Sequence, residues 1–117
     1  STDSGRTWQP RGLAESHHLS RVVLHPSAPG TLWVAALGPL FSSAPAERGI
    51  YKSTDGGATW RRTLAGPNDN TGAADLIIDP QDPDVLYAAL WERTRRPWNF
   101  WEGGPGTGLY KSTDGGE

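Results

Sequence analysis

The chain lacks cysteine, has little net charge and contains no long apolar run. The absence of cysteine excludes disulfides and thiolate metal sites. A formal net charge of −2 gives no positive field of the kind that attracts nucleic acids. No apolar stretch is long enough to cross a membrane, and no signal peptide is visible. We therefore expect neither nucleic-acid binding nor membrane insertion.

An eight-residue phrase is present twice in full and once in its first six residues. It reads Ser-Thr-Asp-Ser-Gly-Arg-Thr-Trp at 1–8, Ser-Thr-Asp-Gly-Gly-Ala-Thr-Trp at 53–60 and Ser-Thr-Asp-Gly-Gly-Glu at 112–117. The copies start at residues 1, 53 and 112, hence 52 and 59 residues apart, a period typical of solenoids and propellers. Strand-like segments at 49–52 and 108–111 lead into two of them. The chain therefore contains an internal sequence repeat.

Each copy of the phrase has the chemistry of a tight turn. An Asp side chain bonds nearby backbone N–H groups, and Gly accepts the positive φ that such turns require. The Ser hydroxyl adds a second local bond, and the closing Trp is placed to cover the turn with a large apolar ring. We therefore expect each copy to join two strands.

The phrase resembles the Asp-box, or BNR, repeat, which reads Ser-x-Asp-x-Gly-x-x-Trp. In families that carry it, this box is a structural turn in a blade of a β-propeller. The resemblance implies a structural role, and no catalytic one, for its positions: Ser1, Asp3, Gly5 and Trp8; Ser53, Asp55, Gly57 and Trp60; and Ser112, Asp114 and Gly116.

A wider resemblance covers residues 20–116. Phrases at 70–76, 79–89 and 104–110 are similar to those of bacterial BNR-repeat proteins described as sortilin-like or glycosyl-hydrolase-like propellers. This group includes peptide-binding sortilin-type receptors, sialidases and glycoside hydrolases that cleave xyloglucan. The resemblance implies a secreted or cell-envelope protein. No catalytic residue of those enzymes can be matched in this chain, so we assign none.

The predicted fold is all-β, with about two four-stranded antiparallel blades of a β-propeller. Residues 1–10 are expected to end a preceding blade, 11–64 to form blade one, and 65–117 to form blade two without its outer strand. A whole propeller needs roughly 4–8 blades. We therefore expect the remaining blades of a parent chain, or other copies of this chain, as partners. Strands are expected at 7–10, 21–24, 32–37, 49–53, 59–64, 76–78, 85–91 and 109–111, with loops at 38–48 and 92–107.

Differences in length between the two repeats gather at one end of the blades. If a blade's strands are called A to D, the step from strand A to B is seven residues in both repeats, from 25 to 32 and from 79 to 86. The offset is the number of residues between equivalent positions of the two repeats. It is 52 at the turn before strand A, 54 at strands A and B, and 59 from strand C onward. The B–C and D–A loops share one end, which we therefore predict to be the binding face.

Residues 91–102 carry the strongest functional signal, with three Trp, one Phe, three Arg and two Glu. Two interpretations remain open: the rings stack on a ligand, or they fold back to anchor a long loop. The first predicts a carbohydrate or peptide ligand. Asp75 and Arg21, on strand A, are expected near the mouth of the central channel. The candidate contacts are Trp91, Glu92, Arg95, Trp98, Trp101, Asp75 and Arg21.

Three further patterns carry less weight. Glu92 and Glu102 are the carboxylates that a glycosidase would use, so the second candidate function is part of a propeller-type glycoside hydrolase, with its catalytic carboxylates partly outside this segment. His17 and His18 point to opposite sides of an extended chain, so no metal or other cofactor is expected. Residues 68–72 lack the later Glu of a calcium loop and are expected to form a turn.

Overall fold

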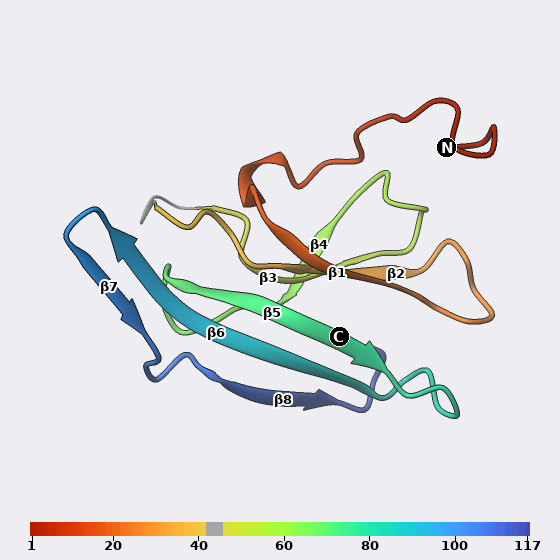
Figure 1. Ribbon diagram of the computed structural model, residues 1–117. Coiled ribbons are helices and arrows are strands. Elements are labelled where there is room, and N and C mark those ends of the chain that lie inside the picture. Colours follow the sequence, from red (N-terminus) through yellow and green to blue (C-terminus); the bar gives the residue numbers. More distant parts are fainter. Residues whose placement is uncertain (42–45) are drawn as a thin grey trace.

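The computed structural model of the chain describes residues 1–41 and 46–117. Its strands form two four-stranded antiparallel sheets that lie against each other (Figure 1). This is the all-β, blade-like arrangement that the sequence predicts. None of the helical segments among these residues is long or apolar enough to span a membrane.

The first sheet is a simple meander in which each strand pairs with the next one along the chain. A single 3₁₀ turn, η1 (Ala14–Ser16), precedes it. The second strand is buried on both faces, as expected for a strand covered by neighbours on either side. The four strands are β1 (Leu19–Leu24), β2 (Leu32–Ala36), β3 (Gly49–Ser53) and β4 (Arg61–Leu64).

The second sheet is built around one long strand. β6 (Leu86–Arg96) has 11 residues; its first part lies between β5 (Thr71–Ile78) and β8 (Gly108–Ser112). Its last part leaves these two strands and pairs with β7 (Asn99–Glu102), forming what we call the β6–β7 hairpin (Figure 1). β5, β6 and β8 thus occupy the places of β1, β2 and β3. Within the part of the chain that the structure describes, no strand takes the place of β4 in this sheet.

The two sheets repeat one register. Leu32 lies opposite Ser53 in the first sheet, and Leu86 lies opposite Ser112 in the second. The innermost strands β1 and β5 have the same irregularity in pairing, directly before Arg21 and directly before Asp75. The repeat in sequence is therefore a repeat in backbone structure.

The main core lies between the sheets. Trp33 is 1% exposed and packs with Leu76 and Leu86 of the second sheet. The Ser20 hydroxyl, on the inner strand, lies 3.1 Å from the carbonyl oxygen of Ala35 and 2.9 Å from that of Ala73. One polar side chain thus joins the inner strands of both sheets where they meet.

The far face of the first sheet has a second, smaller core. Leu13, from the connector before β1, packs there with Val34, Ala36 and Tyr51. The connector before β1 is therefore more than a polar loop, because it buries Leu13 against the sheet.

Several predicted strand bounds are wrong. Residues 7–10 form no strand: Trp8 is 80% exposed, and no described strand lies beside it to supply backbone hydrogen bonds. The predicted loop 92–107 is largely the β6–β7 hairpin, because its Thr and aromatic residues favour strands. β5 starts at Thr71 instead of 76, and β4 starts at Arg61 instead of 59. The predicted loop 38–48 includes residues 42–45, which lie outside the described residues.

Candidate functional site

The repeated phrases form turns with one shared hydrogen-bond pattern. In the turn at 53–60, the Ser53 hydroxyl donates to Asp55 Oδ1 at 2.7 Å, and the Gly57 backbone N–H donates to Ser53 Oγ at 2.9 Å. Asp55 also accepts from the backbone N–H and the hydroxyl of Thr59, at 2.9 and 2.6 Å. Gly57 has a φ of 83°, the left-handed conformation that glycine adopts most readily. The serine and aspartate bonds recur at 1–8 and 112–117.

These bonds favour the charged form of each aspartate. The hydrogen bond from the Ser1 hydroxyl, with those from Thr7, lowers the pKa of Asp3 from 3.8 to about 2. The hydroxyl and backbone N–H of Thr59 lower the pKa of Asp55. The Ser112 hydroxyl lowers the pKa of Asp114 in the same way. The carboxylates are occupied by their own turns, so their role in this structure is to hold the backbone.

The last two turns lie at one end of the sheets, beside the β1–β2 and β5–β6 connections. The Gly56 N–H donates to the Gly30 carbonyl and the Gly115 N–H to the Asp84 carbonyl, both at 2.9 Å. The third turn also touches the first sheet, because Trp33 Nε1 donates to the Gly115 carbonyl at 3.1 Å. The groups at this end of the sheets are therefore engaged in holding the turns and strands together.

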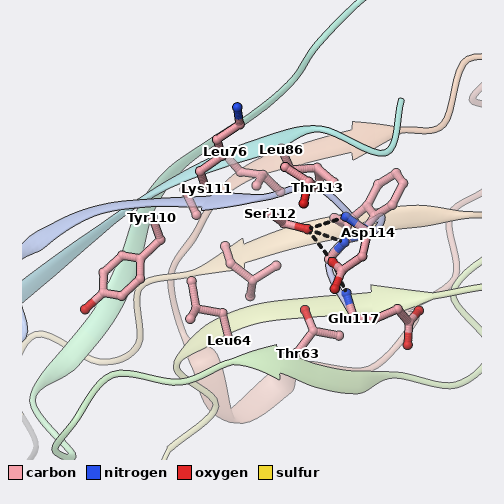
Figure 2. Close-up of a pocket in the computed structure, with 14 residues that line it drawn as sticks. Thr63, Leu64, Leu76, Leu86, Tyr110, Lys111, Ser112, Thr113, Asp114 and Glu117 are labelled. Atoms are coloured by element: carbon pink, nitrogen blue, oxygen red, sulfur yellow. Dashed lines mark hydrogen bonds between the residues drawn. The ribbon is translucent and has the colours of Figure 1, made fainter. Parts of the chain in front are cut away.

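A hollow of about 280 Å³ lies between the sheets next to the third turn (Figure 2). Leu64 of β4 lies on one side of it, Leu76 and Leu86 of the second sheet lie on the other, and Tyr110 of β8 also lines it. Glu117 closes one end through ion pairs with Lys52, at 2.6 Å, and with Arg61. The hollow has an apolar lining and lies at the unpaired edge of β8. One more strand at this edge would extend the core into it, so we do not treat it as a chemical site.

The opposite end carries a different kind of hollow. The guanidinium carbon of Arg95 lies 5.5 Å from the ring centre of Phe100, its partner across the hairpin, and 5.6 Å from that of Phe41 in the first sheet's β2–β3 connection. Trp98, at the hairpin turn, is 79% exposed. We call the space beside them, about 350 Å³, the hairpin hollow; it is lined by Leu40, Phe41, Thr94, Arg95, Arg96, Pro97 and Trp98.

The two faces of the hairpin separate the remaining candidates. Neighbours on a strand point to opposite faces, and residues directly opposite across a pair share a face. Glu102 lies opposite Arg93, whereas Trp101 lies opposite Thr94. Glu92 is next to Arg93 on the strand, so Glu92 and Glu102 lie on opposite faces. They do not form the pair of carboxylates that glycosidase chemistry requires.

Glu92 supports the base of the hairpin. Its side chain is buried, with the residue 5% exposed, and its Oε2 accepts from the Gly106 N–H at 2.7 Å. A Cβ at Gly104 would lie 2.5 Å from the Trp101 ring and 2.7 Å from the Glu92 carboxyl carbon, so only glycine fits between them. Trp101 and Glu92 therefore pack together on the side away from Arg95.

Arg21 and Asp75 form a separate pair on the inner strands. Arg21 Nε lies 2.8 Å from Asp75 Oδ1, with both side chains about half exposed. The hydrogen bond from Arg21 lowers the pKa of Asp75, and the same bond raises the pKa of Arg21. Asp75 lies opposite Ala89, six residues before Arg95 on β6, a separation of about 20 Å along an extended strand. This pair is not part of the hairpin hollow.

Of the candidate contacts, Arg95 and Trp98 line the hairpin hollow. Arg21 pairs with Asp75, and Glu92 packs with Trp101, outside it. The Trp91 ring is covered by Arg93, whose guanidinium carbon lies 4.8 Å from the ring centre. Sequence reasoning missed Phe41 and Arg96, although Phe41 lies in one of the loops on the end predicted to bind. In the described parts of the chain, no three His, Cys, Asp or Glu side chains gather as metal ligands would.

Comparisons with known proteins add evidence on the fold. No protein-family model and no curated protein matches the chain. Among solved structures, an ancestral GH74 enzyme matches with a TM-score of 0.67 and 20% sequence identity. GH74 enzymes are β-propeller glycoside hydrolases. The chain has the fold of a β-propeller segment. The match covers 98% of this chain and 14% of the enzyme, so the chain spans a small part of that propeller's length.

Proposed function

We propose that this propeller segment binds carbohydrate in the hairpin hollow. The observation that carries the proposal is that Phe41 and Trp98, from different sheets, border one hollow while remaining 69% and 79% exposed. Aromatic faces of this kind stack on the apolar faces of sugar rings. The volume of about 350 Å³ is within the range of small-ligand pockets, roughly 300–1,000 Å³.

Local packing does not account for this exposure. A two-residue connection between β6 and β7 needs turn-forming residues, and Pro97 supplies the fixed φ of a turn without help from a tryptophan. An exposed aromatic group beside a hollow is typical of a surface that meets a partner. A saccharide is favoured over a peptide because the fold is similar to that of glycoside hydrolases.

Membership of a family and location are further parts of the proposal. The turn at 53–60, with its Ser53, Asp55 and Thr59 bonds, supports placing the chain among Asp-box (BNR) propellers similar to sortilin-like proteins. Such a protein would be secreted or part of the cell envelope. The unpaired edge of β8 would be covered by the remaining blades of a parent chain or by another copy of this chain.

The second candidate function is part of a propeller-type glycoside hydrolase. The fold similarity favours it. Because Glu92 and Glu102 lie on opposite faces of the hairpin, the catalytic carboxylates of such an enzyme would be completed by residues outside this segment.

A panel of oligosaccharides separates these functions. The chain should retain saccharides by titration calorimetry without releasing products. New reducing ends would favour the hydrolase, and the absence of any saccharide binding, with a folded protein, would contradict both proposals.

A further inference from the structure

The hairpin hollow is basic although the chain as a whole is acidic. Two arginines, Arg95 and Arg96, line it, and among the described residues no Asp or Glu does so. Neither arginine forms an ion pair with any residue in 1–41 or 46–117. The formal charge of the hollow is thus positive in a chain whose net charge is −2.

The nearest acidic residues of the hairpin are directed elsewhere. Glu92 is buried and bonded to the Gly106 N–H at 2.7 Å. Glu102 lies directly opposite Arg93. Burial lowers the pKa of Arg93, and the charge of Glu102 offsets part of this lowering. The two arginines of the hollow are therefore not neutralised by the carboxylates that are closest in sequence.

Arg95 is oriented by aromatic rings. Its guanidinium carbon lies 5.6 Å from the ring centre of Phe41 and 5.5 Å from that of Phe100. Neither contact is a hydrogen bond, so the N–H groups of the guanidinium remain available, and their edge matches both oxygens of a carboxylate. A cation held in this way loses little side-chain freedom when an anion binds.

We propose that the hairpin hollow binds an acidic saccharide through a sugar carboxylate. Arg95 donates to this carboxylate, Arg96 adds a second positive charge, and Trp98 stacks on the sugar ring. This inference rests on the proposed function, because it specifies the class of saccharide that the same site takes.

A pair of probes with one sugar backbone, whose carboxyl groups are either charged or esterified, tests the inference. Oligogalacturonide and its fully methyl-esterified form should be titrated into the whole 117-residue chain at low ionic strength. The acid should bind at least about 10-fold more tightly than the ester, since charge-assisted hydrogen bonds are among the stronger ones. The preference should shrink as salt is added, because the hollow is open to solvent.

Matched variants assign the preference to the hollow. Arg95→Gln should remove most of the preference for the acid, Arg96→Gln should reduce it, and Arg95→Lys should restore part of it. Arg6→Gln makes the same change of charge in the exposed first turn and should leave the preference unchanged. Melting curves for every variant establish that each remains folded.

The outcomes distinguish this inference from the proposed function. Equal binding of acid and ester would overturn the inference while leaving carbohydrate binding in place. A preference for the acid that survives Arg95→Gln and Arg96→Gln would overturn it too, because the carboxylate would then be bound elsewhere. If a poly-glutamate peptide bound as tightly as the acidic saccharide, the inference would also be overturned, because the site would then recognise negative charge without recognising a sugar. Binding of no saccharide in the panel, acidic or neutral, would remove the proposed function itself.

Discussion

Two tryptophans of the β6–β7 hairpin should respond in opposite ways to the same substitution. Trp98 lies at the turn and lines the hairpin hollow, whereas Trp101 lies on the other face against Gly104. We predict that Trp98→Ala weakens saccharide binding and lowers stability much less than Trp101→Ala does. Trp101→Ala should lower stability and leave binding nearly unchanged.

The expected sizes follow from exposure. A tryptophan side chain buries up to roughly 250 Å². Trp98 is 79% exposed, so folding removes about 50 Å² of it from water, worth about 1 kcal/mol at about 25 cal/mol per Å². Trp101 is 45% exposed, so about 140 Å² is buried, worth about 3 kcal/mol. If Trp98 is a binding hot spot, its loss should weaken binding by about 2 kcal/mol, roughly 30-fold.

The assay is a thermal melt and a calorimetric titration, with a saccharide retained from the panel, for each variant. Trp8→Ala is the matched control, because Trp8 is 80% exposed in the first turn, far from the hollow. It should leave binding unchanged and lower stability about as much as Trp98→Ala does. The reasoning fails if Trp98→Ala destabilises the fold as much as Trp101→Ala does, or if affinity falls only in the Trp101 variant.

Three other predictions concern the turns and the base of the hairpin. Asp55→Ala should lower the Tm by several degrees in calorimetry, because the turn loses the acceptor of three hydrogen bonds; an unchanged Tm would contradict the structural role of the turn. The pKa of Asp3 is depressed in the folded chain from 3.8 to about 2, so its stabilising contribution is present above pH 3.8 and is lost as pH falls through about 2; urea unfolding should show this decline, which Asp3→Asn should reduce. Gly106→Ala should cost about 1–3 kcal/mol in chemical unfolding, because its Cβ would lie 2.0 Å from Thr71 Oγ1, whereas Gly108→Ala, with no such clash, should be nearly neutral.

The repeated blade could be predicted because its signals are local. Asp and Gly chemistry marks the turns, and apolar runs between Pro and Gly mark β2 and the first half of β6. Equal spacing in the two repeats also gives the matched pairs Leu32 with Ser53 and Leu86 with Ser112. Such features depend on residues close together in the chain, so one sequence is enough to read them.

The hairpin could not be predicted in the same way. All four residues of β7 are exposed, so it lacks the alternation of buried and exposed positions that identifies a strand lying on a core. The hairpin hollow depends on Phe41 meeting Arg95, residues 54 positions apart, and their meeting follows from how the two sheets pack. The composition of the stretch singled it out but could not separate Trp98 from Trp101, since that separation depends on strand pairing.

The Arg21–Asp75 pair shows where the two repeats must differ. Both residues follow the same irregularity in the inner strand, and each faces a matching alanine, Ala35 or Ala89. If the second blade copied the first at this position, two arginines would meet where Nε and Oδ1 now lie 2.8 Å apart, and like charges at that distance repel. An exposed ion pair adds little stability, so its effect is mainly on which blades fit side by side. The repeats therefore agree where each blade must fold by itself, at the turns and the register, and differ where neighbouring blades meet.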